Sequence, residues 1–316
     1  MPRVFQHFCS DVCSFASNMD SVPDAFFDAI CSQLESKDLG NLQKIYYWWS
    51  SLAASHDSKR RKIFVILNVN AEGTQVGIRI NDINRNACTF SALKPRYDRI
   101  ASISVGLLEM DDFSEKTSLE CFEKTVMPWL LSLVFKCKLD LTCQALPRNF
   151  ADSIVNGLRG CSQLSRILIA NYDGCAEFIK LQISLGHLKD LDLRGSYKCP
   201  DDMNLSLKSF LRSPNFESLY LSESNLKLDF DMVNCFVERF RKGNIASSAY
   251  LEGKVSFPLE RFDYLFVDKQ ENDRYRRYNG RSSTKTSTVA NRKFQVIVST
   301  DLSHDNVLRF DIRSLL

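Results

Sequence analysis

Leu188-Lys-Asp-Leu-Asp-Leu193 decides the fold of this chain, because its leucines stand three and then two positions apart. Alternating apolar residues are typical of a strand with one buried side. The same core recurs at positions 139, 167, 191 and 219, as Leu139-Asp-Leu141, Ile167-Leu-Ile169, Leu191-Asp-Leu193 and Leu219-Tyr-Leu221. Repeats of this length indicate supersecondary units that stack to share a core. The sequence therefore predicts strands that lie side by side, each followed by a helix.

Apolar residues at helical spacing fill the intervals, and they predict helices over 151–158, 176–185, 205–211 and 232–240. These units resemble leucine-rich repeats in their LxxLxL cores. Arg194 and Ser222 stand where that family has an asparagine, so the likeness extends only to the stacked strand-helix shape. The residues between the core positions would form the exposed side of the strands, namely Asp140, Leu168, Asp192 and Tyr220.

The flanking segments have a different period. Residues 63–69 and 76–80 alternate around Ala71-Glu-Gly73, which is a hairpin signature, and residues 100–107 alternate again. A helix of about twenty residues is expected from Ser114. Near the C-terminus, Phe294–Val298 and Val307–Ile312 predict a closing hairpin.

We therefore expect an α/β chain with five segments. Residues 1–18 differ in composition from the rest of the chain and are expected to be an unstructured extension, with Met19 as an alternative start. Then come a helical motif over 19–60, a small antiparallel sheet over 61–113, strand-helix repeats over 114–245, and a β-rich segment over 246–316 with a polar loop at 269–291.

Composition narrows the class of protein. The 316 residues are 44% hydrophobic and 25% charged with a net charge of +3, which is the balance of a folded domain without the positive field of a nonspecific nucleic-acid binder. No stretch reaches the roughly 20 apolar residues that a bilayer requires, and residues 1–18 lack the apolar core of a signal peptide. Eleven cysteines without a CxxC pair predict reduced thiols. The expected location is cytoplasmic or nuclear, with no membrane partner.

The common catalytic signatures are absent: the chain has no GxxxxGK[ST], GxGxxG, HExxH or GxSxG. We expect surface or capping roles for His56, His187 and His304, and helix-start roles for Asp111-Asp112 and Asp201-Asp202. The basic stretch from Arg274 to Arg281 is interpreted first as a solvated loop, with a protein contact or a nucleic-acid contact as alternatives. The sequence predicts no catalytic residue, no cofactor and no metal site.

The helical start carries the most specific signal. Val22-Pro23, Phe26, Ile30, Leu34, Lys37-Asp38-Leu39, Leu42, Ile45, Trp49 and Leu52-Ala53 follow one another at the spacing of the F-box motif without a gap. The stretch resembles that motif, although Val22, Phe26, Phe27, Cys31 and Trp48 depart from it. Together with Met19-Asp-Ser-Val-Pro23, Trp48-Trp-Ser-Ser-Leu-Ala53 and Pro95-Arg-Tyr-Asp-Arg-Ile100, the chain looks like a large, nematode-expanded group of F-box-like proteins.

That resemblance implies a function. F-box proteins bind a Skp-type adaptor of a cullin-RING ubiquitin ligase through the motif and hold a protein target through the repeats, so the chain would be no enzyme itself. The positions implied for partner binding are Pro23, Phe26, Phe27, Ile30, Leu34, Leu39 and Trp49. Three alternatives stay open: a plain amphipathic helix pair, a repeat scaffold with no ligase role whose N-terminal helices cap the stack, and an enzyme or nucleic-acid protein acting through the Arg274 to Arg281 stretch.

Overall fold

The structure is a computed structural model, and it describes residues 24–45, 47–106, 108–142, 146–170, 174–195, 199–246, 248–258, 261, 276–278, 282–289, 292–300 and 306–314. The expected extension over 1–18, Pro23 and His304 lie outside the described residues. The chain forms two compact units. The helical unit consists of the described residues up to Lys62 together with Leu93–Arg99, and the sheet unit consists of Ile63–Ala92 and the described residues from Ile100 onward.

The helical unit contains α2 (Asp24–Gln33), α3 (Ser36–Leu42) and α4 (Tyr47–Lys59). Its interior is small: Cys31, Leu39 and Ala53 are buried, and Leu34, Leu42 and Leu52 pack around them. Two arginines donate hydrogen bonds to backbone carbonyls at the end of α2, where helical carbonyls lack intrahelical partners. Arg60 donates to Cys31 O at 2.7 Å, and Arg99 donates to Ser32 O at 2.9 Å. The described part of the region expected to be helical is therefore largely helical, and residues 93–99 belong to the same unit.

The sheet unit is mixed α/β around a mostly parallel sheet. The sheet order is β12-β13-β14-β15-β11-β9-β8-β7-β6-β4-β1-β2-β3. The strands at its N-terminal end are β1 (Arg61–Val69), β2 (Gln75–Asp82), β3 (Ala87–Cys88), β4 (Asp98–Val105) and β5 (Glu115–Ser118). The middle strands are β6 (Val134–Leu141), β7 (Leu164–Ile169), β8 (Asp190–Asp192), β9 (Ser218–Tyr220) and β11 (Tyr250–Val255), with β10 (Lys227–Leu228) beside β11. The last strands are β12 (Arg276–Tyr278), β13 (Ser282–Val289), β14 (Arg292–Thr300) and β15 (Asn306–Ser314).

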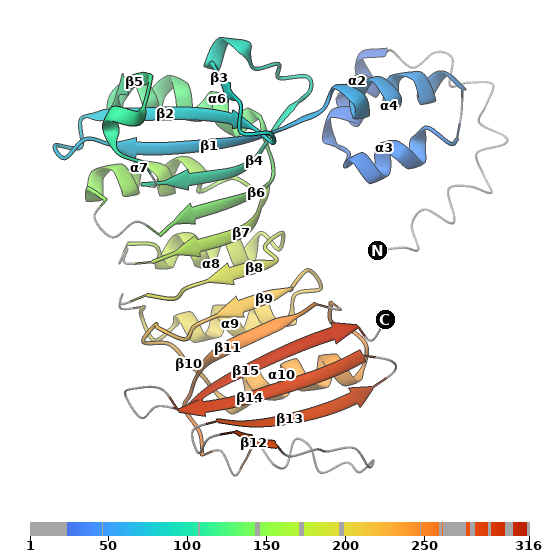
Figure 1. The fold of residues 1–316 in the computed structure, drawn as a ribbon, viewed down its shortest axis with the longest axis vertical. Coiled ribbons are helices and arrows are strands. Elements are labelled where there is room, and N and C mark those ends of the chain that lie inside the picture. The colour runs from blue at the N-terminus through green and yellow to red at the C-terminus, as the bar shows by residue number, and fades with distance from the viewer. Residues whose placement is uncertain are drawn as a thin grey trace. The chain divides into compact units, whose positions relative to one another are not determined.

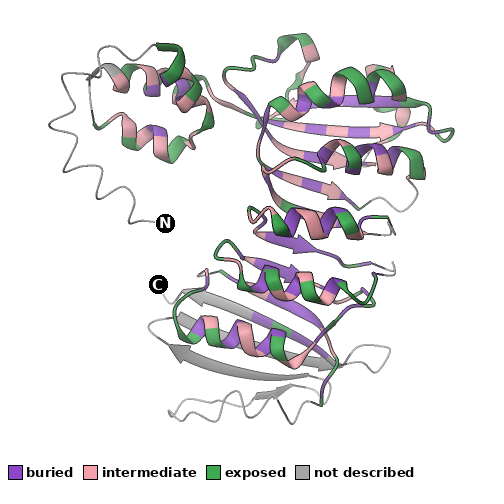
Figure 2. Ribbon diagram, turned by 180° about the vertical axis from the view of Figure 1, so that it is seen from behind, coloured by how far each residue is buried: buried purple, intermediate pink, exposed green. Residues whose placement is uncertain are grey.

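Among the described residues of the sheet unit, helices cover one face of the middle strands and none covers the other. The connecting helices are α7 (Arg148–Leu158), α8 (Ala176–Ser184), α9 (Met203–Arg212) and α10 (Phe230–Arg241). They lie behind the strands in Figure 1 and in front of them in Figure 2, where their outer sides are exposed and their sheet sides buried. From β4 through β6, β7, β8, β9 and β11, each neighbouring pair is parallel. We call the side without helices the open face.

The repeated apolar cores form the interior of this unit. Leu139, Ile167, Leu191 and Leu219 are all completely buried. Phe150, Phe210 and Phe236 from the helices are buried with them. The strands and helices predicted from the repeat are therefore confirmed, with ends that differ by a few residues.

Several expectations about the flanks were wrong. The β1–β2 hairpin is antiparallel as predicted, with Ile63 opposite Asp82, but β4 pairs in parallel with β6. The helix expected from Ser114 begins only at Leu119, because β5 first pairs with β2. It then runs through α5 (Leu119–Cys121), a π-helical turn (Phe122–Val126) and α6 (Met127–Ser132).

The polar loop expected over 269–291 is partly strand. Within it, β12 and β13 pair antiparallel. Thr284, Thr286 and Thr288 alternate along β13. Threonine has a high strand propensity, which favours an extended backbone even where the polarity of the sequence suggests a loop. The closing hairpin is confirmed as β14 and β15, which pair antiparallel from Arg292 opposite Ser314 to Thr300 opposite Asn306.

The paired aspartates lie in a short helical turn or directly before a helix. Asp111 and Asp112 lie in a 3-10 turn (Met110–Asp112), and a second such turn spans Phe90–Ala92. Asp202 directly precedes α9, but its carboxylate accepts from Lys180 Nζ at 2.6 Å and makes no cap hydrogen bond. Asp202 thus lies at a helix start as expected, although its partner is on the neighbouring helix α8. Asp111 and Asp112 do not begin the helix expected from Ser114, because β5 follows their turn and the helix starts only at Leu119.

Candidate functional site

The residues implied for partner binding divide into interior and surface groups. Phe27 is 2% exposed and Leu39 is completely buried, so both belong to the interior of the helical unit. Phe26 is 55% exposed, whereas Ile30, Leu34 and Trp49 are half-buried. Phe27 packs edge-on against both Phe26 and Trp49. The described part of this set therefore offers Phe26 most openly, on a helix whose other side is anchored in the unit's interior.

One more apolar side chain of the helical unit is open to solvent. Ile45, which follows α3, is 50% exposed. It belongs to the F-box-like spacing, although it was not among the implied partner-binding residues. A large apolar side chain on the surface adds to the area that a partner can bury.

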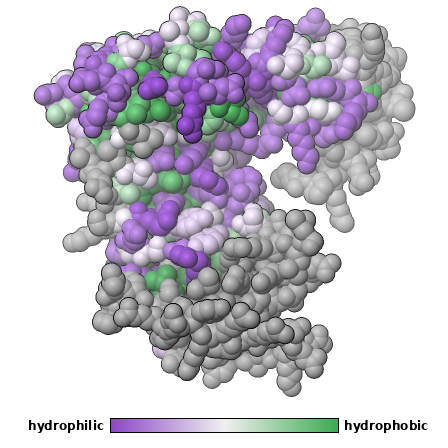
Figure 3. Space-filling model, viewed as in Figure 1, coloured by the Kyte–Doolittle hydropathy of each residue, from purple (hydrophilic) through white to green (hydrophobic). Residues whose placement is uncertain are grey.

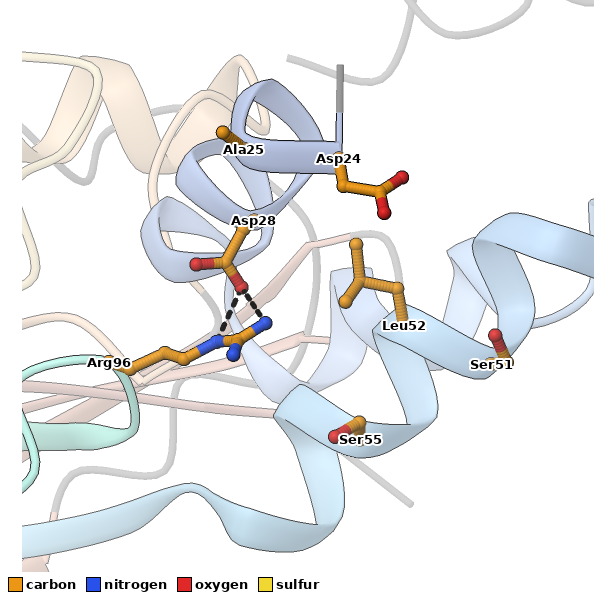
Figure 4. Close-up of a pocket in the computed structure, with 7 residues that line it drawn as sticks. All are labelled: Asp24, Ala25, Asp28, Ser51, Leu52, Ser55 and Arg96. Carbon is orange, nitrogen blue, oxygen red and sulfur yellow. Dashed lines mark hydrogen bonds and ion pairs between the residues drawn. The ribbon is translucent and has the colours of Figure 1, made fainter. Parts of the chain in front are cut away.

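A hollow of about 720 Å³ lies in the same unit, beside the start of α2 and the middle of α4. Its lining residues, drawn in Figure 4, are Asp24, Ala25, Asp28, Ser51, Leu52, Ser55 and Arg96. Arg96 donates through Nε to Asp28 Oδ1 at 2.6 Å, and its Nη2 lies at the same distance. The carboxylate of Asp28 thus joins a helix to the segment 93–99.

His56 is completely buried, which corrects the prediction of a surface or capping role. Its Nε2 lies 2.6 Å from Asp28 Oδ1, and its ring packs 5.4 Å from the ring of Tyr97. Burial alone raises the pKa of Asp28, but hydrogen bonds from His56 and Arg96 lower that pKa below its ordinary value. Asp28 and His56 are 28 positions apart, so no local pattern could have joined them.

The open face of the sheet unit carries two rows of side chains. Strand register places one row across the sheet in the order Ser102, Lys138, Arg166, Asp190, Ser218 and Tyr250. It places the other in the order Ser104, Asp140, Leu168, Asp192, Tyr220, Glu252 and Arg309. The predicted face residues Asp140, Leu168, Asp192 and Tyr220 thus all fall in the second row. Figure 3 views this face and shows hydrophilic side chains over its middle strands.

Ion pairs link the members of these rows. Arg166 donates from Nε and Nη2 to Asp190 Oδ2 at 2.9 and 2.7 Å, and Ser218 donates its hydroxyl proton to the same carboxylate. Arg194, just after β8, donates to both oxygens of Asp192. The guanidinium of Arg194 lies 5.1 Å from the centre of the Tyr220 ring, which favours a cation–π contact.

A second cluster lies toward the C-terminal strands. The rings of Tyr220 and Tyr250 stack with centroids 4.6 Å apart. Tyr250 donates its hydroxyl proton to Glu252, and Arg309 donates to Glu252 Oε2 at 3.0 Å. Burial raises the pKa of Glu252, but the hydrogen bonds from Arg309 and Tyr250 bring that pKa below its ordinary value. Burial and the neighbouring carboxylate both raise the pKa of Tyr250, so it stays a hydrogen-bond donor.

These rows border a hollow of about 470 Å³ on the open face. Its walls include Arg166, Leu168, Asp192, Arg194 and Tyr220. A second, smaller hollow of about 230 Å³ lies near the starts of β7, β8 and β9, with Lys136, His187 and Lys189 among its lining residues. Lys136 has a φ of +48°, and β6 shifts register against both neighbours here. Such a bulge re-aims a side chain.

A scan of protein-family models finds no match to this chain, and a search of curated proteins finds no significant match. Within the described residues, none of the helices combines the length and apolar character that crossing a membrane requires. The same residues contain no cluster of three side chains placed to hold a metal ion.

Proposed function

We propose that this chain is the substrate-recognition subunit of an SCF-type cullin-RING ubiquitin ligase. In this proposal the helical unit binds a Skp-type adaptor, and the open face of the sheet unit binds a protein target. Other subunits of the ligase would carry out the transfer of ubiquitin. The proposal rests on the ungapped F-box-like spacing from Val22 to Ala53 in a unit with its own small interior.

The observation that carries the proposal is the exposure of Phe26 and Ile45. Both are half or more exposed, although the same unit buries other apolar side chains such as Phe27 and Leu39. Exposed aromatic and aliphatic groups next to a packed interior favour a partner that completes the burial. The interior side chains Phe27 and Leu39 would then support this surface and set its shape.

The experiment is co-purification of the intact chain with a Skp-type adaptor. We expect capture of the adaptor by the intact chain and a loss of about tenfold or more for Phe26→Ala combined with Ile45→Ala, because truncated anchors typically cost that much. The matched control is Leu205→Ala, which removes a 72% exposed leucine from α9 in the sheet unit. Its capture should equal that of the intact chain.

Equal and poor capture by the intact chain and the Phe26→Ala, Ile45→Ala variant would remove the support for adaptor binding. The repeat scaffold without a ligase role would then be the better account of the chain. Circular dichroism of each variant separates a lost surface from a lost fold.

A further inference from the structure

We propose that the open face binds a carboxylate-rich segment of a protein partner. This deepens the proposed function by naming the chemistry of the target, and it is tested separately from adaptor binding. The residues that carry it are Arg166, Arg194 and Arg309, with Lys138 at the edge of the same face.

The charges on this face are layered. In four of the ion pairs the acid is less exposed than its cation. Lys189 and Glu217, at the edge of the larger hollow, are about equally exposed. The side chains of Asp190 and Asp192 are both 12% exposed, and that of Glu252 is 8% exposed. Their partners Arg166, Arg194 and Arg309 are 49%, 47% and 48% exposed. A ligand that approaches therefore meets guanidinium groups, although the paired charges sum to zero.

The chemistry of these groups selects the ligand. A guanidinium has five N–H donors in a planar fork, so one edge can bind its buried carboxylate while another edge faces outward. Carboxylates from a partner fit such a fork, and a fixed guanidinium loses little freedom on binding because its partner already orients it. The buried acids thus preorganise the cations, and they have little exposed surface with which to repel an acidic ligand.

The smaller hollow also favours carboxylate ligands. Lys136 and Lys189 line it together with His187, and the bulge in β6 places Lys136 at this edge of the strands. Burial, and then Lys189, lower the pKa of Lys136, which agrees with two cations held near each other. Lys189 pairs with Glu217, and the described lining of this hollow contains no carboxylate. Lysines thus line the smaller hollow, whereas the arginines of the larger one stand among the carboxylates of Asp190, Asp192 and Glu217. Glu217 is the most exposed of these three acids, and Lys189 neutralises it.

The surrounding side chains suit a protein chain. Tyr220 and Tyr250 form a stacked aromatic pair in the middle of the face, and Leu168 contributes an apolar wall to the larger hollow. Aromatic side chains beside arginine are the composition that protein interfaces favour. The face therefore combines anchors for apolar groups with forks for carboxylates.

The test measures binding of a fluorescein-labelled peptide of alternating glutamate and leucine by fluorescence anisotropy, at about 150 mM salt where exposed charges are screened beyond about 8 Å. The deciding pair of variants is Leu168→Glu and Leu168→Gln. Both place a polar side chain of similar size at the same point of the hollow, and neither removes a member of an ion pair. We expect Leu168→Glu to bind at least about tenfold more weakly than Leu168→Gln, since like charges repel in a half-buried site.

Two further variants examine the arginines. Arg194→Ala should weaken binding by about tenfold, the value of a lost charge-assisted hydrogen bond. Arg148→Ala on α7, which removes an arginine side chain that is 84% exposed, should leave affinity within about twofold. Arg194→Ala also leaves Asp192 without its cation, so the fold of this variant is checked by circular dichroism. If the variant proves unfolded, the comparison of Leu168→Glu with Leu168→Gln carries the test alone.

Several results would overturn the inference. Equal binding by the two Leu168 variants is one, and preference for the corresponding lysine-leucine peptide is another. A single-stranded DNA of equal charge that binds as tightly as the peptide and responds to the same variants would show a general polyanion site instead. Adaptor capture without peptide binding contradicts this inference and leaves the proposed function supported. Peptide binding without adaptor capture contradicts the proposed function and leaves this inference supported.

Discussion

Substitution of Arg309 tests how much its ion pair with the buried carboxylate of Glu252 contributes to stability. Glu252 is 8% exposed in its side chain and receives hydrogen bonds from Arg309 and Tyr250. Arg309→Ala leaves the carboxylate with the tyrosine but without its cation. Loss of one partner of a buried ion pair costs about 3–5 kcal/mol. Arg309 is 48% exposed, so solvent screens part of that interaction and we expect a loss of about 1–3 kcal/mol.

The second variant in this cycle is Glu252→Gln, which keeps the shape and removes the charge. In the presence of Arg309→Ala, Glu252→Gln should recover about half or more of the lost stability, because no uncompensated charge stays buried. Urea unfolding followed by circular dichroism gives the free energies. Hydrogen exchange of β9 and β11 reports the local effect, since Leu219 pairs with Leu251 between these strands.

The pH dependence gives an independent check. In the intact chain the pKa of Glu252 lies below its ordinary value, so its contribution to stability is present above the unfolded pKa and is lost as pH falls through the folded pKa. Arg309→Ala removes the largest cause that lowers this pKa, so we expect the pKa of Glu252 in the variant to lie above that in the intact chain. The gap between Arg309→Ala and the intact chain should therefore narrow from pH 7 to about pH 4. A gap of equal size at both pH values, or no gap at pH 7, would refute this reasoning.

Two further predictions concern the interior of the sheet unit. Leu191 is completely buried, whereas Leu168 is half-buried on the open face. In urea unfolding, Leu191→Ala should therefore lower the free energy of unfolding by about 2–5 kcal/mol, and Leu168→Ala by less than about 1.5 kcal/mol. The reverse order would contradict the assignment of the two faces. Burial and the nearby Cys161 raise the pKa of Cys137 from 9.0 to about 12, which cuts its thiolate fraction at pH 8 by roughly a thousandfold. Mass spectrometry after iodoacetamide treatment should thus find exposed Cys121 modified long before Cys137, and equal rates would show that the sheet opens readily.

Local periodicity explains what could be predicted from the sequence. The cores from Leu139 to Leu221 alternate as one side of a strand does, and the intervals between them leave room for one helix each. The same reasoning located the row through Asp140, Leu168, Asp192 and Tyr220 on the side away from the helices, because alternate residues of a strand point to opposite sides. Their exposure was overestimated, since Asp192 is buried and the other three are half-buried.

Contacts between distant segments could not be predicted in this way. Arg166 meets Asp190 across 24 positions, and Glu252 meets Arg309 across 57. Which acid meets which base depends on register between strands, and the spacing of charges along the chain does not specify it. The burial of His56 beside Asp28 and the addition of residues 93–99 to the helical unit are of the same kind. The segment at 115–118 formed a strand because β2 offered a free edge, which is a tertiary effect.

The spacing of side chains along each row, from one strand to the next, restricts the conformation of a ligand that runs across the strands. Neighbouring strands lie about 4.8 Å apart, so a chain running from β6 to β11 meets a new side chain at that interval. One turn of α-helix advances about 5.4 Å, whereas side chains on one side of an extended chain recur about every 6.6 Å. Over four steps a helix drifts from the rows by about 2.4 Å and an extended chain by about 7 Å. A helical ligand would keep step with the sheet, and an extended one would have to lie along a strand.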